Sequence, residues 1–164
     1  MKSSIEAGVR RTTVGEKNGF TLIELIITVT IIGILAALAV PLARNSIQRE
    51  KEFALRQALR DIRTAIDKYK DASDRGFIQV KVGTEGYPES LEVLVEGVQM
   101  VGAVDKKLKF LRRIPLDPMT NSPKWGLRAY QDDPKMYQGG GQNVFDIYTK
   151  SDGIALDGTK YKDW

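Results

Sequence analysis

The longest apolar run in the sequence extends from Phe20 to Leu42. Its 23 residues include no basic side chain, and Glu24 is their one formal charge. At about 1.5 Å per residue, a helix of this length measures roughly 35 Å, enough to cross the hydrocarbon core of a bilayer with some tilt. The run therefore predicts a membrane-spanning helix over residues 20–42.

A different pattern follows over residues 43–75. Apolar residues recur at spacings of three and four, as in an amphipathic helix, at Leu55, Ala58, Leu59, Ile62, Ile66 and Tyr69. Good helix formers flank Pro41, so we expect one near-continuous helix from about Phe20 to Arg75. Its apolar stripe suits a coiled-coil seam or, more simply, a face on which a small domain packs.

Residues 76–164 are punctuated by turn signals. Pro88 at a first helical turn and Gly97 after an apolar segment predict a short helix between them. The runs 124–131 and 143–150, rich in aromatic and β-branched residues, predict two antiparallel strands. We therefore expect an α+β fold, in which the second half of a long helix packs on a small domain with an antiparallel sheet.

Composition removes several kinds of chemistry. The 164 residues include no cysteine and no histidine, which excludes a disulfide scaffold, the usual zinc and thiol sites and a Ser-His-Asp triad. The net charge of +4 is spread along the chain, and no dense basic tract predicts a nucleic-acid partner.

Asp117, Asp132 and Asp133 could be considered for acid–base chemistry, but each lies beside a proline or in a turn, so we expect no enzyme. The glycine run Gly139–Gly141 lacks the spacing of a phosphate-binding loop and the Lys-Ser/Thr that would follow it, so we predict a turn there.

Glu24 needs an explanation, and three interpretations of its segment compete. In the first, the helix is a plain single-pass anchor with Glu24 near the interface. In the second, it is a secretory signal cleaved at Ala37-Leu38-Ala39, although the apolar run is too long and contains an acid.

The third interpretation gives the acid a partner. A charge at membrane depth costs about 2.5–3.5 kcal/mol or more, so it usually pairs there. Cleavage between Gly19 and Phe20 would create an α-amino group four residues from Glu24. Identical subunits packed side by side could then pair the ammonium of one chain with the carboxylate of the next, which would also set their axial register.

The segment Gly19-Phe20-Thr21-Leu22-Ile23-Glu24 resembles the type IV prepilin signature. This resemblance implies cleavage by prepilin peptidase after Gly19, N-methylation of Phe20 and a role in assembly for Glu24. It divides the chain into a leader (1–19), the membrane and assembly half of a spine helix (20–42), its amphipathic half (43–75) and a globular domain (76–164).

The later segments "YPESLEVLV", "FLRRIPLDP" and "FDIYTKSDG" are similar to those of the major pseudopilin of type II secretion. The resemblance implies a homo-oligomeric helical filament in the bacterial periplasm, made of subunits stored in the inner membrane with the globular domain on the periplasmic side. Minor pseudopilins and an inner-membrane secretion platform would be its partners. Two alternatives stay open, a type IV pilus subunit for adhesion, motility or DNA uptake, and a monomeric membrane-anchored binding domain.

Major pseudopilins hold their C-terminal loop with calcium, which takes about six to eight oxygen ligands. The resemblance implies that Asp152 and Asp157 bind the ion, with Asp163 as a third ligand. The loop departs from the family pattern, because it is shorter before Asp152 and carries nearby lysines that would repel a cation, Lys150, Lys160 and Lys162. The alternative is that Asp152-Gly153 and Asp157-Gly158 form ordinary turns.

Overall fold

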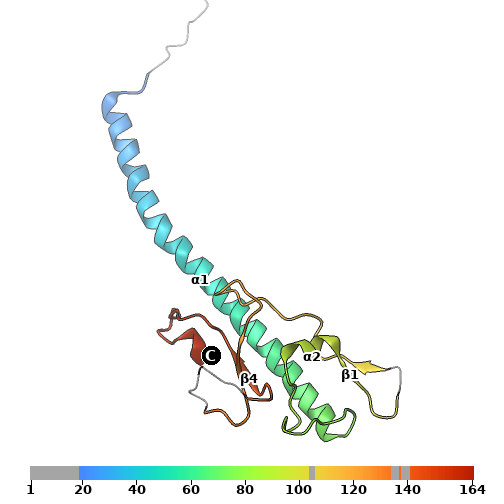
Figure 1. Ribbon diagram of the computed structural model, residues 1–164. Coiled ribbons are helices and arrows are strands. Elements are labelled where there is room, and N and C mark those ends of the chain that lie inside the picture. Colours follow the sequence, from blue (N-terminus) through green and yellow to red (C-terminus); the bar gives the residue numbers. More distant parts are fainter. Residues whose placement is uncertain (1–18, 104–105, 134–136, 138–140) are drawn as a thin grey trace, which may run out of the picture. The chain divides into compact units, whose positions relative to one another are not determined.

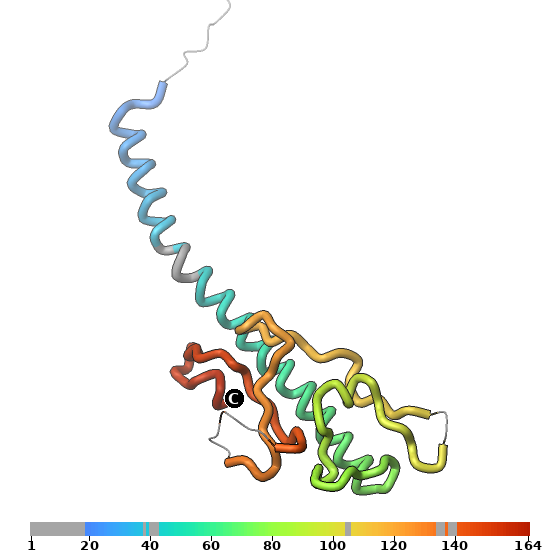
Figure 2. Tube along the Cα trace, in the orientation of Figure 1, coloured from blue at the N-terminus to red at the C-terminus, as the bar shows by residue number. Residues whose placement is uncertain are grey.

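The computed structural model describes residues 19–103, 106–133, 137 and 141–164, with the backbone alone at residues 38 and 40–42 (Figures 1 and 2). Leader residues 1–18, and Gly139 and Gly140 of the predicted turn, lie outside the described residues.

The elements are α1 (Leu22–Asp74), α2 (Leu91–Glu96), β1 (Val98–Gln99), β2 (Lys107–Leu108), β3 (Gly126–Arg128), β4 (Asp146–Tyr148) and a 3-10 helix, η1 (Tyr161–Asp163). A long helix with small antiparallel sheets confirms the α+β prediction. The chain divides into two units, Met1–Pro41 and Leu42–Trp164.

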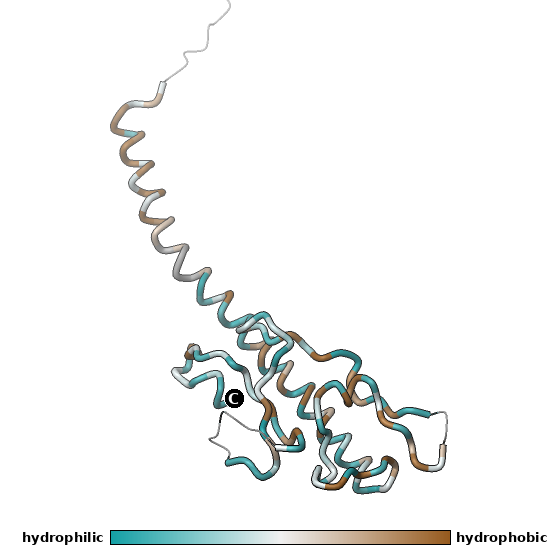
Figure 3. The backbone as a smooth tube through the Cα atoms, in the orientation of Figure 1, coloured by the Kyte–Doolittle hydropathy of each residue, from teal (hydrophilic) through white to brown (hydrophobic). Residues whose placement is uncertain are grey.

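The described part of the first unit is helical from Leu22 onward, and α1 continues without a break through Pro41. The large apolar side chains described in the first unit are exposed, beginning with Phe20 just before the helix (80%) and Leu22 at its start (78%). Figure 3 shows this stretch as mostly hydrophobic. Two polar side chains of the run bond within the helix. The Thr28 hydroxyl donates to the carbonyl of Leu25 at 2.9 Å, and the Thr30 hydroxyl donates to that of Ile26 at 2.7 Å. Among the described residues, no helix combines the length and the hydropathy needed to cross a membrane.

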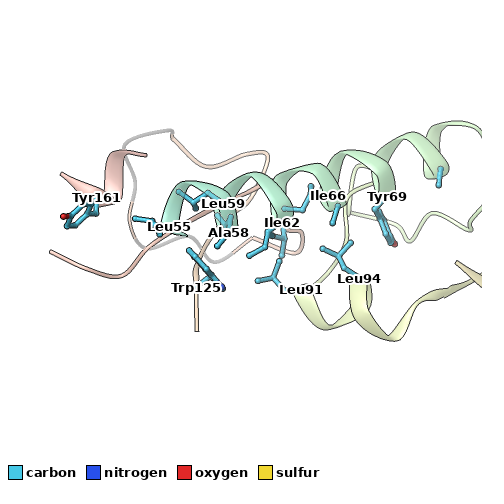
Figure 4. Close-up of a cluster of buried hydrophobic side chains, with 14 of the residues drawn as sticks. Leu55, Ala58, Leu59, Ile62, Ile66, Tyr69, Leu91, Leu94, Trp125 and Tyr161 are labelled. Atoms are coloured by element: carbon cyan, nitrogen blue, oxygen red, sulfur yellow. The ribbon is translucent and has the colours of Figure 1, made fainter. Parts of the chain in front are cut away.

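The second unit forms its core on the amphipathic stripe of α1. All six apolar residues of the predicted stripe are buried, from Leu55 to Tyr69. They pack with α2 residues and with side chains from later segments, among them Trp125 and Tyr161 (Figure 4). This packing confirms that the stripe is the face on which a small domain folds.

The short helix after Pro88 begins later than predicted. α2 starts at Leu91 with Ser90 as its N-cap, and it buries Leu91 and Leu94. Pro88 is not in the helix, and its carbonyl accepts a hydrogen bond of 2.7 Å from the amide of Val144. The predicted start was therefore wrong by three residues, because a long-range backbone contact holds Pro88 outside the first turn.

The sheet content consists of two separate antiparallel pairs. β3 pairs with β4, with Leu127 opposite Ile147, which confirms the two predicted strands in shortened form. The pair β1–β2, with Val98 opposite Leu108, was not predicted. Each of its strands has two residues, too few to show an alternation of apolar and polar positions.

Candidate functional site

The N-terminal site begins with the segment around the predicted cleavage point. Gly19 and Phe20 precede α1 and are exposed, and among the described residues beyond its chain neighbours no atom lies within 4 Å of where a Cβ on Gly19 would be. Thr21 caps the helix, because its hydroxyl accepts the amide of Glu24 at 3.2 Å and its carbonyl accepts that of Leu25 at 3.1 Å. The two predicted processing residues thus lie in accessible, non-helical backbone directly before a capped helix.

Glu24 lies in the first turn of α1 with an exposed side chain. There its negative charge complements the positive end of the helix dipole. The spacing Thr-x-x-Glu is that of a capping box, a local sequence signal that the predictions above did not include. No described residue donates a hydrogen bond or forms an ion pair with its carboxylate. The reciprocal capping-box bond to the Glu24 carboxylate is therefore absent, and only its favourable interaction with the helix dipole must be separated from its predicted role in assembly.

The C-terminal loop contains the three predicted calcium ligands, and each has its own partner. Asp152 forms an ion pair with Lys162. Asp157 accepts the amide and the hydroxyl of Thr159 at 2.9 and 2.6 Å, and these bonds hold its pKa below the usual carboxyl value. Asp163 accepts a hydrogen bond from the hydroxyl of Tyr137.

Each carboxylate that the resemblance assigns to calcium is thus engaged by a group of the chain itself. The described residues contain no group of three or more acidic side chains placed to hold a metal ion. The positive charge next to Asp152 is a lysine of the same loop, one of the three that the sequence places near it.

A row of polar side chains on α1 contacts the loop, and the sequence pattern alone did not predict this contact. We call these residues the polar stripe: Gln48, Glu52, Arg56 and Arg63. The first three recur every four residues and so share one helix face. Polar residues at that spacing usually face solvent, and only the fold reveals that a distant loop covers them.

The aspartates considered for acid–base chemistry have structural partners. Asp117 is fully buried, and its carboxylate accepts the amide of Met119 and the hydroxyls of Thr120 and Thr149, at 2.9, 2.9 and 2.5 Å. Asp132 accepts the amide of Ala129 at 2.7 Å and closes a turn. Both carboxylates hold loops together.

Comparison with known proteins bears first on the N-terminal segment. A family model described as "Prokaryotic N-terminal methylation motif" matches residues 16–40. This match includes Gly19, Phe20 and Glu24. No solved structure matches the chain.

Curated relatives extend the similarity to the rest of the chain. The type II secretion system core protein G of Pseudomonas aeruginosa is 27% identical over 141 residues, 82% of this chain and 82% of the relative. The protein of the same name from Escherichia coli is 31% identical over 112 residues, 65% of this chain and 69% of the relative. The type IV major fimbrial protein FimA of Dichelobacter nodosus is 49% identical over 51 residues, 31% of this chain and 33% of the relative.

These relatives are structural pilin and pseudopilin proteins, which agrees with the prediction that the chain is no enzyme. The match to the Escherichia coli protein covers more than two thirds of that protein. The chain belongs to the type IV pilin-like family of the type II secretion system core protein G.

Proposed function

We propose that the chain is the major pseudopilin, which is processed before Phe20, held in the inner membrane and polymerised into a periplasmic pseudopilus that drives type II secretion. The family relationship makes it a pilin-like subunit of type II secretion or of type IV pili. The observation that carries the proposal is the helix of the first unit, whose large apolar side chains have no cover within the described chain.

That helix needs an apolar environment from outside the chain. Exposed residues face every side of it, as the neighbouring positions Leu25, Ile26 and Ile27 do, each more than half exposed. At about 25 cal/mol per Å² of apolar surface, leaving so many such side chains in water is unfavourable. Lipid would cover them in the stored subunit, and the helices of other copies would cover them in a filament.

Glu24 would then direct assembly. After cleavage, the α-amino group of Phe20 in one subunit pairs with the Glu24 carboxylate of a neighbour. Because the contact joins two different surface patches, it propagates along a filament instead of closing into a dimer. Growth would depend on prepilin peptidase, minor pseudopilins and an inner-membrane platform that supplies the work.

The extent of similarity favours secretion over a surface pilus. The two core protein G relatives align with 82% and 65% of the chain, whereas the fimbrial relative aligns with 31%. The similarity to core protein G thus includes much of the globular domain, where pilins and pseudopilins would differ. A monomeric membrane-anchored binding domain is the remaining alternative, and failure of the processed native chain to cross-link into oligomers would favour it.

Two substitutions of Glu24 separate assembly from helix capping. The Thr21 hydroxyl caps the helix by accepting the backbone amide of Glu24, so Glu24→Gln keeps this cap and removes the charge. We expect both Glu24→Gln and Glu24→Ala to reduce the filament yield by tenfold or more, which corresponds to about 1.4 kcal/mol per contact. Cross-linking and electron microscopy measure this yield. The helix content in detergent should stay at the native value.

The same samples test processing, because mass analysis should show a mature chain that begins at methylated Phe20 in the native protein and in both variants. Thr21→Ala serves as the capping control and should leave the filament yield nearly intact. Normal filaments from Glu24→Gln would contradict the charge-pairing mechanism. A native chain that functions with residues 1–19 still attached would contradict the proposed function itself.

A further inference from the structure

The loop from Asp152 to Trp164 is fastened to α1 at several points along the polar stripe. Glu52 makes the central contact, since its Oε1 accepts the amide of Leu156 and the hydroxyl of Tyr161, both at 2.9 Å. Gln48 donates to the hydroxyl of Tyr161 at 2.9 Å and to the carbonyl of Ile154 at 3.2 Å. One turn of helix thus holds three successive parts of the loop.

The two arginines of the polar stripe continue this attachment. The Arg56 guanidinium lies 4.1 Å from the centre of the Trp164 ring and 3.5 Å from the Asp157 carboxylate. Arg63 donates to the main-chain oxygen of Trp164 at 2.7 Å and to the Asp146 carboxylate of β4, also at 2.7 Å. The end of the loop and the strand before it are therefore bound to the same side chain of α1.

Within the loop, charges are balanced by the chain itself. Lys162 contacts the Asp152 carboxylate, and the pKa of Lys162 is raised, chiefly by that hydrogen bond. The Asp152 side chain is 84% exposed, so this ion pair is weak compared with the contacts of Glu52. The loop also bonds to itself, since the Trp164 indole donates to the Thr159 hydroxyl at 2.7 Å.

We propose that the loop 152–164 is fastened to α1 by the polar stripe and keeps its fold without a divalent cation, with the Lys162 ammonium supplying the positive charge beside Asp152. This inference concerns the folded subunit and does not depend on filament formation. It departs from the calcium site that the family resemblance implies, because the loop's carboxylates already have partners in the chain.

Chymotrypsin cleavage after Tyr161 provides the measurement. The side chain of Tyr161 is buried, so cleavage requires the loop to open. The full chain in detergent micelles is digested in EGTA and in millimolar calcium chloride, with product identified by mass. We expect the same rate in both, and a rate that falls saturably with added calcium would overturn the proposal.

Matched variants test the side chains that replace the ion. Glu52→Ala should speed cleavage after Tyr161 roughly 2- to 10-fold, with or without calcium, because it removes two acceptor contacts. Glu50→Ala removes an exposed carboxylate from the same helix turn and should leave the rate unchanged. Equal rates for these two variants would overturn the role of the polar stripe.

A second pair of variants tests the ion pair itself, in which the Asp152 side chain is 84% exposed and the Lys162 side chain 25% exposed. Lys162→Met should speed cleavage roughly twofold, as expected for an ion pair with a largely exposed partner. Lys160→Met removes the same charge from an exposed position two residues away and should have no effect. A Lys162→Met rate equal to that of Lys160→Met would show that the ammonium does not hold the loop.

Discussion

The two units of the chain use the apolar residues of α1 in opposite ways. In the second unit, the apolar stripe from Leu55 to Tyr69 repeats along one face of α1 and is covered by α2, β4 and the loops. In the first unit, they occupy all sides of the helix and are exposed. Apolar residues on one face of a helix therefore indicate that other parts of the same chain cover them. Apolar residues on all sides indicate that lipid or another molecule covers them.

One carboxylate from each unit shows the same difference in where its partners lie. Asp117 is fully buried and accepts three hydrogen bonds from its own chain. Glu24 lies among apolar side chains, and no described residue pairs with its carboxylate. A buried charge is tolerated only when it is paired, so the chain supplies the donors for Asp117 and, in our proposal, a neighbouring subunit supplies the cation for Glu24.

The largest expected effect on stability is that of truncating a buried isoleucine of the second unit, compared with truncating an exposed isoleucine of the first. Ile62 is fully buried, and Ile62→Ala should lower the free energy of unfolding by about 2–5 kcal/mol. Ile27 is 51% exposed, and Ile27→Ala should change it by less than about 0.5 kcal/mol. Urea unfolding of the full chain in detergent, followed by tryptophan fluorescence, measures both, and equal losses would break the distinction between the units.

A smaller effect is expected at the paired carboxylate. Asp117→Ala leaves a partly buried amide, the buried hydroxyl of Thr149 and the hydroxyl of Thr120 without their acceptor and should cost about 1–3 kcal/mol. Asp67→Ala, at an exposed position on α1, provides the control and should be nearly neutral. The same urea titration applies. A neutral Asp117→Ala would mean that the loop around it is held by other contacts, such as the 2.9 Å bond from the Trp125 indole to the Pro115 carbonyl.

The smallest effect is a dependence on alkaline pH that only the second unit should show. Burial, assisted by the Glu89 carboxylate, raises the pKa of Tyr69 above its ordinary 10.0. The unfolded chain then releases this proton more readily than the folded one. The stabilisation is complete below pH 10.0 and is lost as the pH rises through the folded pKa.

Tyr69→Phe should therefore flatten the fall in stability above about pH 10, measured by urea unfolding at several pH values. Tyr130→Phe, at an exposed tyrosine, is the matched control and should keep the native slope. An unchanged slope in Tyr69→Phe would show that other tyrosines or lysines dominate the alkaline transition.

Periodic patterns predicted most of the fold. The stripe from Leu55 to Tyr69 identified the face of α1 that packs, since burial on one side of a helix leaves a period near 3.6. The runs of aromatic and β-branched residues located β3 and β4. What escaped prediction depends on single contacts between distant segments, such as the bond between Val144 and Pro88 that delays the start of α2.

The candidate sites divide along a similar line. Gly19, Phe20 and Glu24 are local in sequence, so a motif could identify them. The contacts of Glu52 with Leu156 and Tyr161 join residues more than one hundred positions apart. Such contacts leave no local pattern, so the role of the loop was predicted from the family resemblance alone.

The hydroxyls of Thr28 and Thr30 bear on how a subunit could leave one environment for another. Each hydroxyl donates to a carbonyl of its own helix, so neither relies on lipid, water or protein for a hydrogen bond. Apart from Glu24, whose proposed partner lies on another subunit, the helix would therefore exchange one apolar environment for another when it passes from lipid into a bundle of its copies. Its withdrawal from the membrane would be opposed mainly by the loss of apolar contacts with lipid, and apolar contacts with other helices of the filament would replace them.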